Sequence, residues 1–161
     1  MNDRDRQYLT RCAELAEEAL RSGNDPFSSL LVSQAGEVLF EDYNRTANGD
    51  ATQHPEFAIA RWAAVHLTPE ERASATVYTS GEHCPMCSAA HGWVGLGRIV
   101  YASSAAQLTG WLEEFGAPPA PVKPLPIQAV LREATVEGPE PSLSERIRKL
   151  HRQNAREQAE R

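Results

Sequence analysis

Residues 77–102 read VYTSGEHCPMCSAAHGWVGLGRIVYA, and this stretch decides the fold class. It opens with a β-prone run at 77–79, continues with a helix candidate at 85–94, and ends with an apolar run at 98–102 that is typical of a buried strand. Alternation of strand and helix predicts parallel pairing of the two strands. Parallel sheets are usually covered by helices on both faces. The stretch therefore predicts an α/β fold.

The chain upstream of this stretch predicts a helix, a hairpin and a second helix. Apolar residues recur at helical spacing between residues 8 and 19, which indicates an opening amphipathic helix. Two apolar runs at 29–33 and 38–43 flank a short segment that contains Gly36, and this pattern indicates a β-hairpin with the glycine in its turn. Segment 55–66 has a helical pattern and begins with proline, which is favoured at the first position of a helix.

The downstream part predicts a helix at 105–115, a proline-rich connector at 118–126, a strand at 127–131 and a C-terminal helix over 142–161. The sequence contains no internal repeat. A chain of 161 residues has the usual size of one domain and can bury a core without disulfide bonds. We therefore expect residues 1–161 to form a single domain.

Composition and charge narrow the class of protein. The chain is 41% hydrophobic and 24% charged, which is near the average for globular domains. Its formal net charge of -6 disfavours long nucleic acid as a partner, because like charges repel the phosphate backbone. No stretch approaches a membrane span, and three cysteines, an odd number, suit a reduced compartment. We expect a cytoplasmic protein that is not bound to a membrane.

Two short motifs contain side chains that can bind a metal ion or transfer a proton. His54 and Glu56 belong to the sequence H-P-E, and Cys84 and Cys87 belong to C-P-M-C. One imidazole and two thiolates offer zinc three ligands, one fewer than a closed structural site, so water can take the fourth position. Helices that begin at these motifs would favour thiolates through their N-terminal backbone amides. Glu56 can then act as a general base beside the metal-bound water.

Three simpler interpretations of these residues compete with this one. The three ligands could form a structural zinc site that lacks its fourth ligand. Cys84 and Cys87 could instead form a redox pair, but that interpretation leaves His54 and Glu56 without a role. Glu56 alone could be an ordinary carboxylate in the first turn of a helix.

The combination of H-x-E with C-x-x-C is part of the signature of zinc deaminases, and residues around it match the same pattern. The matching residues are Pro26, Phe27, Asn44, Asp50, Met86 and Trp93. On these motifs the chain resembles the cytidine-deaminase-like superfamily, and more narrowly its bacterial guanine deaminase and tRNA adenosine deaminase branch. The resemblance implies a three-layer α/β/α sandwich around a mixed sheet of about five strands. It also implies one Zn²⁺ ion per chain and a homodimer.

The resemblance further implies a role for each residue of the site. His54, Cys84 and Cys87 would hold the zinc ion, which lowers the pKa of bound water to about 7. Glu56 would be catalytic, moving protons from this water to a ring nitrogen and to the departing amine. The substrate contacts would be Asn44, which reads the ring edge, Phe27, which stacks on the ring, and Pro55, His83 and Trp93.

The chain departs from the family pattern beside the metal ligands. His83 stands where the family usually has proline, and Pro55 stands where it usually has a small residue. Ser29 lies in a region that usually carries glycine or alanine. Because Pro55 and His83 adjoin ligands, they can reshape the pocket and change the preferred substrate.

These observations predict a zinc-dependent hydrolytic deaminase that acts on a free nucleobase or a related amino-heterocycle. A guanine-like purine, a cytosine-like pyrimidine, a non-standard base and an aminotriazine all remain open. A tRNA adenosine deaminase is the alternative within the same chemistry, although it would need a basic surface. A zinc-stabilised binding protein without catalysis is the alternative from another class.

Overall fold

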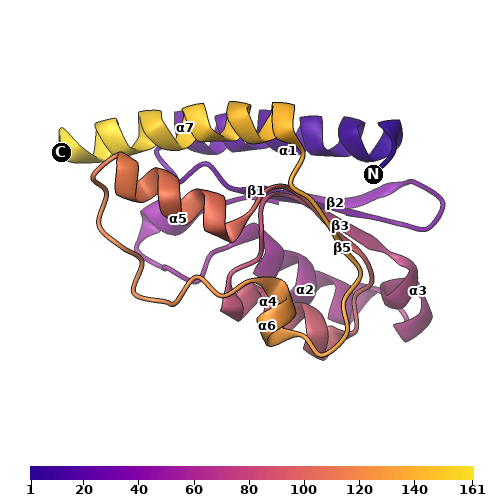
Figure 1. Ribbon diagram of the computed structural model, residues 1–161. Helices are drawn as coiled ribbons and strands as arrows, with labels where there is room; N and C mark the ends of the chain where they lie inside the picture. Colours follow the sequence, from indigo (N-terminus) through magenta and orange to yellow (C-terminus); the bar gives the residue numbers. More distant parts are fainter.

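The computed structural model describes residues 1–161 and centres on a five-stranded sheet with the order β2-β1-β3-β4-β5 (Figure 1). The strands are β1 (Ser28–Val32), β2 (Val38–Tyr43), β3 (Thr76–Gly81), β4 (Ile99–Ser103) and β5 (Val136–Glu137). β1 pairs antiparallel with β2 and β3, whereas β3, β4 and β5 are parallel. The sheet is mixed, as predicted.

Seven α-helices and one 3-10 helix surround this sheet. They are α1 (Asp3–Arg21), α2 (Pro55–His66), α3 (Pro69–Ser74), α4 (Pro85–Val94), α5 (Ala105–Glu114), α6 (Ile127–Val130), α7 (Pro141–Ala159) and η1 (Thr46–Asn48). Figure 1 shows α1 and α7 side by side on one face of the sheet and α2 and α4 on the other. None of these helices combines the length and apolar character that a membrane span requires.

The central strand β1 shows why helices cover both faces. All five of its residues are buried, so neither face of this strand meets solvent. Leu30 packs in the cluster that contains Leu9 of α1 and Ile147 of α7. Its neighbour Leu31 points to the other face and packs against Ile59 of α2. Helices on both faces of the sheet confirm the expected α/β/α sandwich.

One sequence prediction was wrong in the C-terminal part. The predicted strand at 127–131 is instead the short helix α6, and the fifth strand lies later, at β5. Apolar residues at Ile127, Val130 and Leu131 are spaced by three and four positions, which suits a helical turn better than a strand. The backbone N–H of Ile127 donates to Glu82 Oε1 at 2.9 Å, so this turn is held beside the end of β3.

A buried ion pair joins the first helix to the sheet. Asp5, in the capping box of α1, is 2% exposed and accepts two hydrogen bonds from the Arg98 guanidinium, at 2.8 and 3.0 Å. The Tyr78 hydroxyl donates to the same carboxylate at 2.7 Å. The bond from Arg98 lowers the pKa of Asp5 well below its usual range, although burial opposes this effect. The pair therefore stabilises the fold above the ordinary pKa of an aspartate.

Replacement of Arg98 by methionine is expected to lower the free energy of unfolding at pH 7 by about 3 kcal/mol, because it leaves Asp5 buried without its cation. The loss should shrink as the pH falls below about 4, because the unfolded wild-type chain then takes up a proton that the folded Asp5 excludes. Urea denaturation at several pH values measures both effects. Arg11→Met, which breaks an exposed pair with Glu41, is the control and should cost less than about 1 kcal/mol. Equal losses in the two variants would contradict the prediction.

Candidate active site

A cavity of about 320 Å³ lies at one end of the sheet, where β1 begins and β2 and β3 end. Because β1 runs antiparallel to both neighbours, Phe27 before β1, Asn44 after β2 and Glu82 after β3 meet at this end. His54, Glu56 and Cys84 line the same cavity. The fold thus brings together residues from four separate segments of the chain.

The three predicted metal ligands converge at the N-termini of two helices. His54 precedes α2 and Cys84 precedes α4 as N-cap residues, and Cys87 lies in the first turn of α4. Their ligand atoms all lie within 4.8 Å of one another. Nδ1 of His54 is 3.6 Å from the sulfur of Cys84 and 3.5 Å from that of Cys87. Zinc bond lengths and tetrahedral angles give an edge of about 3.6 Å between such atoms, so the set fits a zinc ion.

The electrostatics of the two sulfurs also suit a cation. Contact with Cys87, together with the neighbouring His54, lowers the pKa of Cys84 to about 4. The same contact raises the pKa of the buried Cys87. The two sulfurs therefore share one proton, and a bound zinc ion would displace it. The helix dipoles of α2 and α4 add a positive potential that favours thiolate ligands.

Glu56 lies in the first turn of α2, one helix position inside Pro55, and is 7% exposed. The hydroxyls of Ser29 and Thr79 each lie 3.0 Å from its Oε1. The same carboxyl contacts the Cys87 sulfur and lines the cavity, so it lies beside the predicted metal ligands. Burial raises the pKa of this carboxyl, while the charge of His54 opposes the rise. A buried carboxyl in this position, with a raised pKa, can accept and release a proton.

Asn44 and Phe27 lie where the sequence predicted, in the wall of the cavity. Oδ1 of Asn44 accepts from the backbone N–H and the hydroxyl of Thr46, at 3.1 and 2.8 Å. The amide nitrogen is therefore the part that can contact a ligand, as a donor. Phe27 packs against Gly81, where an added Cβ would lie 3.4 Å from its ring.

Pro55, His83 and Trp93 do not line the cavity. Pro55 and His83 are buried, and His83 packs edge-on against the ring of His91. Trp93 is 90% exposed. Six residues separate it from Cys87, which turns its side chain to a different face of α4, away from the ligands. The arrangement within one chain does not support the predicted substrate contacts of these three residues.

Four lining residues carried no motif in the sequence. They are Asp25, His151, Asn154 and Gln158, of which the last three belong to α7. Their spacing of three and four positions along one helix face was the only available signal. Glu82 and a set of apolar or small residues (Leu108, Leu112, Ala117, Pro118 and Ala120) also line the cavity without having been predicted. Ser29 and Thr79, which hold Glu56, were also not assigned to the site.

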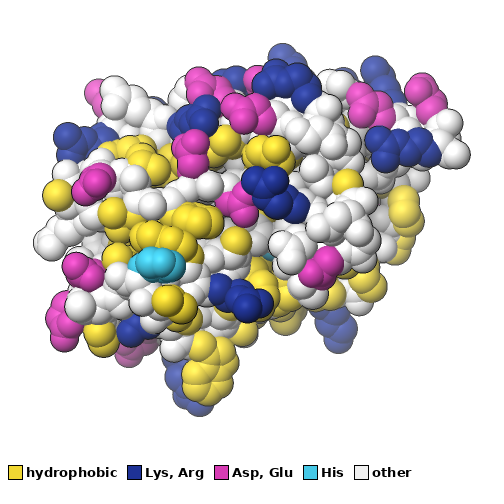
Figure 2. Space-filling view, turned by 180° about the vertical axis from the view of Figure 1, so that it is seen from behind, with side chains coloured by type: hydrophobic (Ala, Val, Ile, Leu, Met, Phe, Trp, Pro, Cys, Tyr) yellow, Lys and Arg dark blue, Asp and Glu magenta, His cyan; other side chains and the backbone are white.

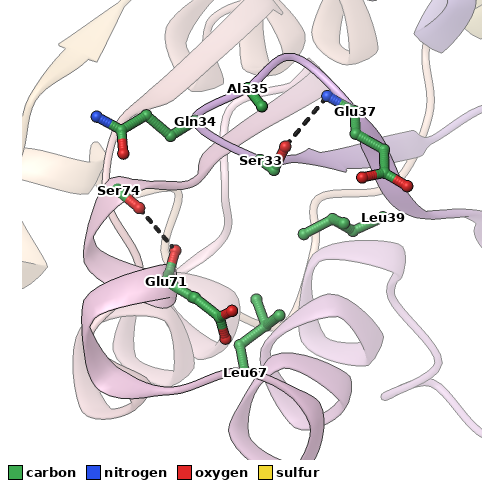
Figure 3. A pocket seen from close by; sticks show the side chains of 8 residues that line it. All are labelled: Ser33, Gln34, Ala35, Glu37, Leu39, Leu67, Glu71 and Ser74. Atoms are coloured by element: carbon green, nitrogen blue, oxygen red, sulfur yellow. Dashed lines mark hydrogen bonds between the residues drawn. The ribbon is translucent and has the colours of Figure 1, made fainter.

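A larger hollow of about 490 Å³ lies elsewhere, between the β1–β2 hairpin and α3 (Figure 3). Polar groups in its wall form hydrogen bonds with residues nearby in the sequence. The backbone N–H of Glu37 donates to Ser33 Oγ at 3.1 Å, and the hydroxyl of Ser74 donates to the backbone oxygen of Glu71 at 3.2 Å. It is lined by no histidine or cysteine. Unlike the smaller cavity, this hollow therefore lacks a set of residues that could bind a metal ion.

Comparison with known proteins places these residues in a family context. The sequence model of the cytidine and deoxycytidylate deaminase zinc-binding region matches residues 2–103. A probable cytosine deaminase from Schizosaccharomyces pombe is 29% identical over 119 residues, which are 74% of this chain and 72% of the relative. Guanine deaminase from Bacillus subtilis is 31% identical over 97 residues, which are 60% of this chain and 62% of that relative.

A solved structure supports the same fold. It comes from a study of tRNA:A34 deaminases and A-to-I editing at the wobble position of transfer RNA. It has a TM-score of 0.64 and 23% sequence identity, and the likeness covers 89% of this chain and 98% of that one.

Proposed function

Because the chain belongs to the cytidine and deoxycytidylate deaminase zinc-binding family, we propose that it hydrolyses the exocyclic amine of a free nucleobase or related amino-heterocycle. The main support for this proposal is that Glu56 lines the same small cavity as His54 and Cys84. Cys87 lies close to His54 and Cys84 and completes the ligand set. A structural zinc site would not need a buried carboxyl that lines a cavity beside the ligands.

The proposed reaction replaces a C–NH₂ group by a carbonyl and releases ammonia. His54, Cys84 and Cys87 would hold a zinc ion, which would lower the pKa of the attacking water to about 7. Glu56 would take one proton from the attacking water and deliver it to a ring nitrogen. It would then take the remaining proton from the new hydroxyl group and deliver it to the amine as the C–N bond breaks. Asn44 would donate to a ring acceptor through Nδ2, and Phe27 would cover one face of the ring.

The size and charge of the cavity favour a free base. Its volume of about 320 Å³ is at the lower end of the range for small-molecule sites. The chain carries a net charge of -6, and on the face shown in Figure 2 the Lys and Arg side chains are interspersed with Asp and Glu. The net negative charge, and the absence of a concentrated basic patch on this face, do not favour RNA.

We also propose a homodimer, with α2 and α4 at its interface. These helices pack against each other and carry Val65 and Trp93, which are 80% and 90% exposed. A second copy would remove these apolar side chains from water. Light scattering that gives only the mass of one chain would contradict this assembly.

Ammonia release tests the proposed activity. The zinc-loaded protein is incubated with guanine, cytosine, melamine, their nucleosides where these exist, and a tRNA anticodon stem-loop. We expect turnover of at least one free base. Turnover of the stem-loop alone would replace the proposal with tRNA editing, and no release from any compound would favour a zinc-stabilised binding protein.

A further inference from the structure

The C-terminal helix α7 supplies one wall of the cavity. His151, Asn154 and Gln158 line the same space as His54 and Glu56, although α7 lies on the opposite face of the sheet from α2 (Figure 1). This helix is held there by the apolar cluster that joins Leu143 and Ile147 to α1. Its polar face therefore meets the cavity as a consequence of packing elsewhere along the helix.

Two amides of α7 orient the carboxylate of Asp25. Asn154 Nδ2 and Gln158 Nε2 both donate to Oδ1 of Asp25, at 2.8 and 2.9 Å. Both donors use the same oxygen. The other carboxylate oxygen of Asp25, Oδ2, accepts no hydrogen bond from a protein side chain. Asp25 lines the cavity and forms no ion pair. The two amide donors fix the orientation of the Asp25 carboxylate, and Oδ2 is left as an acceptor for a ligand.

His151, which also lines the cavity, has a second polar atom without a hydrogen-bond partner. The side chain is 3% exposed, lines the cavity, and has no hydrogen-bond partner for its Nε2. Its ring packs against Phe27 with a centroid distance of 4.9 Å. Burial lowers the pKa of His151 to about 4, so the ring is neutral near pH 7. A buried polar atom without a partner is unfavourable, and a ligand that bonds to it removes that cost.

The charged groups of the cavity wall all have the same sign. Asp25, Glu56 and Glu82 line it, and no lysine or arginine does. Glu82 is already engaged, since it accepts from the backbone N–H groups of Ala105 and Ile127 at 2.8 and 2.9 Å. Asp25 is therefore the carboxylate free to meet a ligand away from Glu56. A phosphate or carboxylate on the ligand would be repelled.

We propose that Asp25 and His151 form a recognition site for a second edge of the heterocycle, distinct from the edge that bears the reacting amine. Oδ2 of Asp25 accepts a hydrogen bond from a ring or amino N–H of the substrate, and the neutral imidazole of His151 makes a second polar contact. The site selects an uncharged heterocycle with an N–H donor on this edge and rejects its phosphorylated forms. This assignment rests on the proposed deaminase function.

Equilibrium binding tests the site without depending on turnover. Guanine, cytosine and melamine are titrated by calorimetry into zinc-loaded protein that carries Glu56→Gln, which blocks their conversion. We expect Asp25→Asn and His151→Phe each to lower the binding affinity for the most tightly bound of the three probes by at least about tenfold. His151→Phe keeps a ring against Phe27, so a loss of affinity reports the lost nitrogen. Asp3→Asn, at a side chain that is 99% exposed, is the matched control and should leave binding unchanged.

Phosphorylated probes test the charge selection. GMP and CMP should bind at least about 100-fold more weakly than the corresponding bases, and Asp25→Asn should narrow this gap. Unchanged base binding in both cavity variants, or no binding of any base, would overturn the recognition site. If ammonia release succeeds while the variants bind normally, the deaminase function stands and only this site fails. If release fails while the variants lose binding, the site stands without catalysis.

Discussion

Glu56→Gln is expected to reduce kcat for ammonia release from the preferred base by about 10²–10⁴-fold while one zinc ion per chain remains bound. Glutamine keeps the length of the side chain, and its carbonyl can still accept from Ser29 and Thr79, which lie 3.0 Å from Oε1. It cannot accept and release the proton that the reaction transfers. The structure should therefore survive while the chemistry is lost.

Steady-state kinetics and metal analysis of the same preparations measure this result. Glu18→Gln is the matched control, because this exposed glutamate lies on α1 outside the cavity. Wild-type turnover in the Glu56 variant with zinc bound would show that another group transfers the proton. Loss of zinc from that variant would mean that Glu56 also supports the metal site.

Cys87→Ala is expected to lower zinc affinity by more than about 100-fold and to abolish ammonia release. The basis for this estimate is that even partners outside the ligand set change metal affinity by about 10–100-fold. The remaining His54 and Cys84 leave zinc with two protein ligands. Because zinc bound to the folded state stabilises it, added zinc should raise the melting temperature of the wild type but not of this variant.

Cys12→Ala is the matched control for this substitution. Cys12 and Cys87 are both fully buried, but Cys12 packs in the apolar cluster between α1 and the sheet. Its replacement should lower stability through a small cavity while zinc stoichiometry stays at one per chain. Full zinc binding by Cys87→Ala, measured against a competing chelator, would contradict the assignment of this ligand.

The sequence predicted the reactive part of the site because that part is local. His54 and Glu56 lie two positions apart at the start of one helix, and Cys84 and Cys87 lie three apart at the start of another. Within each pair, helix geometry sets the relative positions of the two side chains. A metal site made of His54, Cys84 and Cys87 further requires the N-termini of α2 and α4 to lie close together. The main strands and helices up to β4 were predictable for a similar reason, since apolar periodicity and Pro55 and Pro85 mark the helices. The short helices α3 and η1 were not predicted.

The sequence pattern at 127–131 gave a wrong element, and the places of Trp93 and His83 depended on tertiary packing. The run at 127–131 is apolar and short, so its spacing alone did not separate a helical turn from a strand, and the bond to Glu82 helps to hold the turn. Trp93 matched a family pattern, but the rotation of α4 between Cys87 and Trp93 carries it to the surface. His83 adjoins a ligand in sequence, yet its side chain is buried outside the cavity.

The layered α/β architecture, the three candidate zinc ligands and the place of Glu56 at the start of a helix could be predicted from short-range spacing in the sequence. The tertiary structure alone decided the remaining wall of the cavity. Asp25 and Asn154 are 129 positions apart and meet at 2.8 Å because α7 packs on α1 through apolar side chains. No local pattern encodes that contact, since it depends on how two distant helices share one face of the sheet.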